Sequence, residues 1–212
     1  MGTIFITTIM PAAISTPIIF PKIIPNNWDE WNKVWNRNKK FVPKVQGTNN
    51  LGSVPWIGFD IYVKDGYDAT DIIKYKCENV NCPDLFASLF DNLDKFPLDI
   101  QVVRVLQSMS SVPAHQDFAH ESNGHSFRSV IHDNNPKQTW YYQNNEGTRQ
   151  YLTMPDDTNT WWYDDNRIKH GTEYIFGHEK QLIMYRGVAR ENQVKTLLDD
   201  SMSHYSNYVL FE

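Results

Sequence analysis

Short apolar runs separated by polar turn segments fill the second half of the chain. Each run is dense in β-branched and aromatic residues, which favour the pleated and half-buried surface of a sheet. Between two of the runs, residues 144–147 (Asn-Asn-Glu-Gly) have the composition of a hairpin turn. The pattern predicts a mainly β fold, a sandwich or barrel of the jelly-roll kind. Its seven predicted strands cover residues 100–106, 127–131, 139–143, 149–154, 160–163, 168–175 and 181–186.

Helices are predicted in the first half and near the end of the chain. Asn27 suits the N-cap of a helix that runs to Lys40, with acidic residues in its first turn. On this helix Trp28, Trp31 and Trp35 recur at helical spacing, and we expect that face to pack in the core. The other predicted elements are a second helix beginning near Pro83, a last helix over residues 190–201, and extended pieces over residues 4–9 and 18–24.

These elements predict a single domain over residues 1–212, because no internal repeat or low-complexity linker divides the chain. We expect residues 1–98 to supply helices and strands that support the barrel, and residues 99–187 to form the β core. Residues 188–212 would then add a C-terminal helix and tail.

The composition is that of a chain that can bury a large core, with 41% hydrophobic and 14% aromatic residues. It therefore excludes a disordered chain, collagen and a coiled coil. The chain has 7 Ala against 19 Asn, which disfavours an all-helical bundle, because Ala is the best helix former and Asn prefers caps and turns. The net charge is −5 and no block of like charges occurs, so we do not expect nucleic acid as the main partner.

The two cysteines, Cys77 and Cys82, are too few for a disulfide scaffold or a cysteine-type zinc site. We expect free thiols in a reducing compartment, with a local disulfide as the alternative. The apolar segment over residues 4–24 is interrupted by prolines and has no Lys or Arg before it, unlike a signal peptide or a membrane span. Ile6 breaks the myristoylation pattern. These features predict a cytoplasmic protein that does not bind a membrane.

A His-x-Asp sequence, His115-Gln116-Asp117, follows the first strand of the predicted β core. In an extended strand, residues i and i+2 point to the same face, so His115 and Asp117 can offer a nitrogen and an oxygen to one ion. His170, which comes 53 residues after Asp117 in a later strand, is the candidate third ligand. Two His and one carboxylate leave three open positions on an octahedral metal, as in non-haem Fe(II) oxygenases. The alternative for the tripeptide alone is a strand-end His paired with its neighbouring Asp.

A co-substrate that binds such an iron needs a cation for its carboxylate. Lys180 lies ten residues beyond His170, a separation that one strand and a turn can span. Arg186 shares the strand face of Lys180 by the period of two and would offer a bidentate fork. Arg128, between apolar neighbours in an earlier strand, is the third candidate. The alternative for these side chains is a solvated charge at a strand end.

Together, His115-x-Asp117, His170 and a cation ten residues later resemble the Fe(II)- and 2-oxoglutarate-dependent oxygenases, over residues 100–186. The resemblance implies a double-stranded β-helix, a jelly-roll or cupin-like fold with flanking helices. Residues 127–130 (Phe-Arg-Ser-Val) are similar to the aspartyl/asparaginyl hydroxylase and proline hydroxylase branch, where an Arg on this strand helps to hold the co-substrate. Two positions depart from that branch: Lys180 stands where it usually has Arg, and Val130 stands where it tends to have His.

The resemblance also implies an activity, the hydroxylation of a C–H bond with Fe(II), 2-oxoglutarate and dioxygen. The products are succinate, CO2 and a hydroxylated amino-acid, peptidyl or small-molecule substrate. The loop over residues 118–126 would form part of a lid, and Trp140, Trp161 and Trp162 would line a dry pocket. The candidate site residues are His115, Asp117 and His170 for Fe(II), and Lys180, Arg128, Tyr142 and Arg186 for 2-oxoglutarate.

Two other functions remain open at this point. A cupin-type isomerase or hydrolase would hold zinc or manganese through His115, His120 and His125, although their five-residue spacing fits neither a helix face nor a strand face. A non-catalytic jelly-roll module would bind a ligand on its aromatic residues, which leaves the His-Asp-His-Lys pattern unexplained. The chain is expected to be a monomer or a homodimer.

Overall fold

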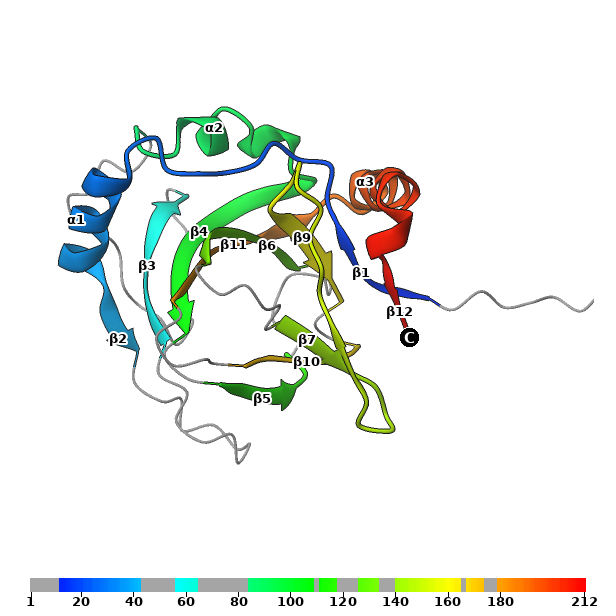
Figure 1. Cartoon of the computed structure of the whole chain (residues 1–212). Helices are drawn as coiled ribbons and strands as arrows, with labels where there is room; N and C mark the ends of the chain where they lie inside the picture. The colour runs from blue at the N-terminus through cyan, green and yellow to red at the C-terminus, as the bar shows by residue number, and fades with distance from the viewer. Residues whose placement is uncertain are drawn as a thin grey trace, which may run out of the picture.

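Two β-sheets face each other in the computed structural model, and helices lie along the outer face of the larger sheet (Figure 1). The structure describes residues 12–42, 56–64, 84–108, 111–117, 126–133, 140–164, 167–173 and 179–212. Within these ranges the larger sheet has eight strands and the smaller sheet has four. The larger sheet runs β12 (Leu210–Phe211), β1 (Ala13–Pro17), β9 (Thr160–Tyr163), β6 (Ser126–Asp133), β11 (Lys180–Ala189), β4 (Leu98–Ser108), β3 (Trp56–Val63) and β2 (Lys40–Val42); the smaller runs β5 (Val112–His115), β10 (Lys169–Thr172), β7 (Trp140–Gln143) and β8 (Arg149–Tyr151).

The eight strands from β4 to β11 are divided between the two sheets in the order of a jelly roll. Counted along the chain from β4, the first, third, sixth and eighth strands lie side by side in the larger sheet as 6-3-8-1. The second, fourth, fifth and seventh form the smaller sheet as 2-7-4-5. All of these pairings are antiparallel. This order confirms the predicted mainly β, jelly-roll or cupin-like fold, a double-stranded β-helix with flanking helices.

The helical layer packs on one face of the larger sheet. Trp31 and Trp35 of α1 are buried as predicted, and the Trp31 Nε1 group donates a hydrogen bond of 2.9 Å to the Gln181 side chain on β11. Trp28 differs from the prediction, because its side chain is 38% exposed and its ring lies against His132. The helices are α1 (Trp28–Asn38), α2 (Ala87–Phe90) and α3 (Glu191–His204), with 3-10 turns at Leu93–Lys95 and Ser206–Tyr208.

A second apolar cluster fills the space between the two sheets. Successive side chains of a strand point to opposite faces of the sheet. Trp161 of β9 therefore belongs to this inner cluster, whereas its neighbour Trp162 packs among the residues under the helices. Trp140 of the smaller sheet meets Trp161 edge to face, with ring centroids 5.8 Å apart. Trp161 therefore fits the predicted interior wall, whereas the prediction for Trp162 was wrong.

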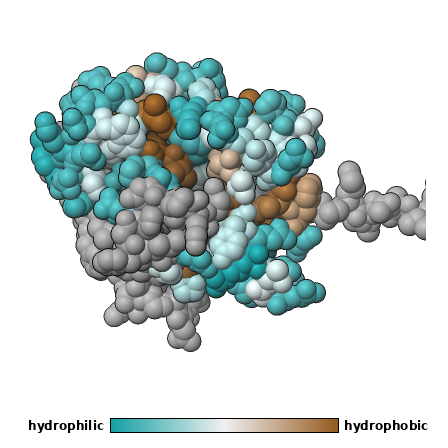
Figure 2. Space-filling view, viewed as in Figure 1, coloured by the Kyte–Doolittle hydropathy of each residue, from teal (hydrophilic) through white to brown (hydrophobic). Residues whose placement is uncertain are grey.

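The surface on the side shown in Figure 2 is mainly hydrophilic, with small apolar areas. Within the described ranges, none of the helices has both the length and the apolar composition needed to cross a membrane.

The seven predicted strands are found as β4 and β6 to β11, with ends that differ by a few residues. The turn at residues 144–147 is confirmed, because Gly147 has a φ of 86° and the Asn144 side chain accepts hydrogen bonds from the backbone N–H groups of Glu146 and Thr148. The last helix, predicted over residues 190–201, is α3.

Other boundaries were predicted less well. The N-terminal strand β1 precedes residues 18–24, which form no strand, since Pro21 and Pro25 lack the N–H group that a ladder needs. Strand β5 was not predicted, because it is short and contains a Pro. The second helix begins at Ala87 rather than near Pro83 and has a single turn. Residues 4–9, Pro83 and both cysteines lie outside the described residues.

Replacing Trp31 by Ala should lower the free energy of unfolding by roughly 3–5 kcal/mol, because a fully buried indole is lost and Gln181 loses its donor. Urea unfolding followed by circular dichroism measures this. Trp28→Ala, on the same helix but exposed, is the matched control and should cost about 1 kcal/mol or less. Equal losses for the two variants would contradict the assignment of Trp31 as the anchor of α1.

Candidate metal centre

The pairing of β5 with β10 brings three of the predicted ligands together. His115 and His170 are Cα partners on these antiparallel strands, and their ring centroids are 4.6 Å apart. Asp117 follows two residues later. One nitrogen or oxygen atom from each of the three side chains lies within 4.8 Å of the others. One detail differs from the prediction: β5 ends at His115, so Asp117 reaches the cluster from the segment after the strand.

The hydrogen bonds of the two imidazoles orient their Nε2 atoms toward Asp117. The Nδ1 atom of His115 lies 2.9 Å from the backbone carbonyl of Pro113, and that of His170 lies 3.5 Å from the carbonyl of Ile168. A carbonyl can only accept, so each Nδ1 is the donor, and in the neutral ring each Nε2 then has a lone pair. These Nε2 atoms lie 3.2 Å (His115) and 3.7 Å (His170) from the Asp117 carboxylate oxygens. When both rings are neutral, their Nε2 lone pairs and the carboxylate face one point, where a bound cation would be stabilised.

The protonation states also suit metal binding. Burial lowers the pKa of His170 to about 4, although the negative charge of Asp117 opposes this shift, so His170 is neutral at pH 7. Loss of solvent would raise the pKa of Asp117, but the two facing histidines and the charge of Arg128 lower it to about 2. An ionised carboxylate and a neutral imidazole are the forms that ligate metals.

Aromatic rings enclose His170, whose side chain is 2% exposed. The Tyr163 ring lies 4.7 Å from the His170 ring, and the Trp140 ring is stacked on it at 6.1 Å with an interplanar angle of 19°. Tyr142, one of the predicted co-substrate residues, is the Cα partner of His170 and is also buried. The site is therefore closed to water on this side, which strengthens electrostatic interactions within it.

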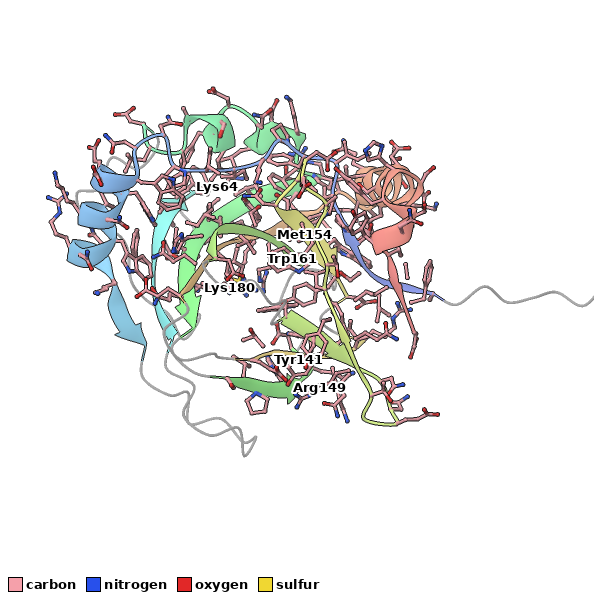
Figure 3. All side chains as sticks on the ribbon, in the orientation of Figure 1. Lys64, Tyr141, Arg149, Met154, Trp161 and Lys180 are labelled. Carbon is pink, nitrogen blue, oxygen red and sulfur yellow. The ribbon has the colours of Figure 1, made fainter. Side chains whose placement is uncertain are left out.

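The three predicted cations all come from the larger sheet, but they differ in their relation to the three ligands. Arg128 is 7% exposed, its guanidinium lies 5.3 Å from the centre of the Tyr163 ring, and its charge acts on both Asp117 and His170. Lys180 lies between the two sheets (Figure 3), and its Nζ atom is 3.3 Å from a carboxylate oxygen of Asp133. Burial lowers the pKa of Lys180, and Asp133 opposes that shift.

Arg186 acts on a buried ion pair that the sequence reasoning missed. The Arg104 guanidinium binds both carboxylate oxygens of Asp60, at 2.5 and 3.2 Å, and the charge of Arg186 also acts on Asp60. The signal was visible, since Arg104 interrupts the run of valines in β4. His120 and His125 of the alternative metal site, and residues 118–125 of the predicted lid, lie outside the described residues.

The donor set fits a divalent transition metal. Two imidazoles and one carboxylate suit Fe(II), Mn(II) and Zn(II), and three ligands on one side leave coordination positions for other molecules. Each imidazole is also held by a backbone carbonyl, the usual support of a metal-binding His.

Comparisons with known proteins give little beyond this geometry. No family model matches the chain. No curated protein matches it significantly either. A solved structure, an oxidoreductase of the 2OG-Fe(II) oxygenase family from Burkholderia pseudomallei, is 10% identical, with a TM-score of 0.42 over 76% of this chain and 81% of that chain. The fold assignment rests on the order of the strands in the two sheets.

The metal-free protein should become less stable as the pH falls from 6.5 to 4. His170 takes up a proton near pH 6.5 when unfolded but only at about 4 when folded, so the unfolded chain binds more protons in this window. The shift corresponds to a loss of up to about 3 kcal/mol in the free energy of unfolding. Urea unfolding in the presence of a chelator measures it.

His170→Gln should reduce this pH dependence. His204→Gln, which changes an exposed histidine on α3, should leave it intact. An unchanged pH dependence in His170→Gln would show that His170 is not held neutral by burial.

Proposed function

We propose that the protein is a non-haem iron dioxygenase that uses 2-oxoglutarate to hydroxylate a C–H bond of an amino-acid, peptidyl or small-molecule substrate. The observation that carries the proposal is the convergence of the His115 and His170 Nε2 atoms on the Asp117 carboxylate. The jelly-roll fold and the ten-residue separation of His170 and Lys180 also support it. The cytoplasm, where thiols stay reduced and iron stays ferrous, would suit this chemistry.

The iron, together with 2-oxoglutarate and dioxygen, supplies the oxidising chemistry when bound, with release of succinate and CO2. The chain itself has three tasks. His115 and His170 would offer ring nitrogens whose orientation is set by backbone carbonyls. Asp117 supplies one negative charge, because its pKa is about 2. Tyr163 and Trp140 keep water from the buried side of His170.

Lys180 and Arg128 would hold different parts of 2-oxoglutarate. The charge of Arg128 acts at Asp117 and His170, so it would stabilise the carboxylate that chelates the metal. Lys180, the partly buried cation at the start of β11, would pair with the distal carboxylate. In that case the distal carboxylate would join or replace Asp133 at the ammonium group. Arg186 is the competitor for this role.

Loss of His170 should remove the metal site. Wild-type protein given Fe(II), 2-oxoglutarate and dioxygen should form succinate, and His170→Ala should lower Fe(II) affinity at least a hundredfold and abolish succinate formation. Anaerobic calorimetric titration and succinate analysis measure the two effects. His204→Ala, far from the three ligands in sequence and exposed, is the control. Succinate formation that survives His170→Ala would overturn the proposed iron site.

Lys180 and Arg128 should differ in which of two co-substrates they help to bind. Lys180→Met should weaken 2-oxoglutarate by roughly tenfold or more but leave 2-oxobutanoate, which lacks the distal carboxylate, almost unchanged. Arg128→Met should weaken both compounds, because both have the chelating carboxylate. Calorimetric titration of the Mn(II)-loaded protein gives these affinities. A selective loss in Arg186→Met instead of Lys180→Met would move the distal site to Arg186.

A further inference from the structure

Two buried indole N–H groups inside the barrel have no acceptor among the described residues. Trp140 is 5% exposed and Trp161 is fully buried, and neither Nε1 atom has a hydrogen-bond partner among the described residues. Both rings belong to the cluster between the two sheets, and Figure 3 shows Trp161 in this space. By contrast, Trp31 on the helical side donates to Gln181. Of these three indoles, the two inside the barrel have no acceptor among the described residues, and the one on the helical side has one.

Leaving two such donors unpaired is costly. A buried donor without an acceptor costs about 1–3 kcal/mol, and phenylalanine would fill an apolar interior without this penalty. The two indoles meet edge to face, at 65°, so an N–H contact with the partner ring can serve only one of the pair. Within the part of the chain that the structure describes, at least one donor is then left without an acceptor, and an acceptor that arrives with a ligand would meet this need.

The position of Trp140 relates this pair to the metal centre. Along β7 and β10, Tyr142 pairs with His170 while Trp140 pairs with Thr172, which is the residue nearer to the connection that leads to Lys180. The Trp140 ring is also stacked on the His170 ring. Trp140 therefore lies directly beside one of the three proposed metal ligands.

The Arg128 guanidinium supplies positive charge near the two donors. Trp161 is the Cα partner of Arg128, and both side chains face the barrel interior. The Tyr163 ring lies beside Arg128, Trp140 and His170 alike, so these side chains form one continuous group. Buried N–H donors next to cations favour an anionic oxygen over a neutral acceptor.

We propose that the indole N–H groups of Trp140 and Trp161 bind the distal carboxylate of 2-oxoglutarate. The inference rests on the proposed function, since it needs the chelating end of the same molecule at His115, Asp117 and His170. A five-carbon diacid held at the metal by one end can reach the Trp140 ring, which is stacked on His170, with its other end. The two tryptophans then add neutral donors to the positive groups of the larger sheet, and they make the pocket selective for a dicarboxylate.

Indole N–H signals of nitrogen-15-labelled protein test this directly. The chain has 7 Trp, and single Trp→Phe variants assign their signals. With Zn(II) in place of Fe(II), saturating 2-oxoglutarate should move the Trp140 and Trp161 signals downfield. The Trp31 signal should stay in place, because its N–H already has an acceptor. Unmoved Trp140 and Trp161 signals at saturation would overturn the inference, as would equal shifts with 2-oxobutanoate.

Affinities provide a second measurement. Trp140→Phe and Trp161→Phe should each weaken 2-oxoglutarate by roughly tenfold and leave 2-oxobutanoate and Zn(II) unchanged. Trp162→Phe is the matched control, since Trp162 is the buried neighbour of Trp161 on the helical side. The two proposals fail differently. Wild-type protein that binds no 2-oxoglutarate overturns the proposed function, whereas binding that is indifferent to both tryptophan variants overturns only this inference.

Discussion

The pairing of β5 with β10 in a single register is the constraint on which the site depends. His115 and His170 meet only in this register, and a slip by one residue would turn every side chain of the strand to the opposite face. Gly171 supports the close approach of the strands, because a Cβ atom there would lie 2.5 Å from the Val112 carbonyl oxygen and 2.6 Å from the Tyr141 hydroxyl. The absence of a side chain next to His170 thus permits the geometry of the three ligands.

Charge in the barrel interior is arranged on the larger sheet, opposite the metal ligands. Arg104 is paired with Asp60 and Lys180 with Asp133, which limits the penalty of removing these ions from water. Arg128 acts on the ligands themselves. An interior of low dielectric with positive groups facing a metal site favours an anionic molecule that spans the two. The proposed role of 2-oxoglutarate follows from this arrangement and from the donor set together.

The sequence predicted the β core well and the site in part. Runs such as residues 160–163 are β-branched and aromatic between turn signals, so local pattern and tertiary pairing agree. The grouping of His115, Asp117 and His170 was also predictable, because it needs only a spacing of two residues and a later inward-facing His. Strand β5 was not, since a Pro-containing segment of four residues pairs only because of its neighbours in the sheet. The position of Arg104 among valines was visible, but the partners of Arg104 and Lys180 were not, because cross-strand partners depend on register, which a single sequence does not reveal. The unpaired Trp140 and Trp161 donors likewise depend on packing across two sheets.

The most direct test of the central claim is a crystal structure of the protein grown without oxygen in the presence of Mn(II) and 2-oxoglutarate. The account predicts one metal ion bound by the Nε2 atoms of His115 and His170 and by the carboxylate of Asp117, with 2-oxoglutarate chelating it in the barrel. A metal ion bound by other residues, or a barrel without 2-oxoglutarate beside a metal bound by these three, would contradict it.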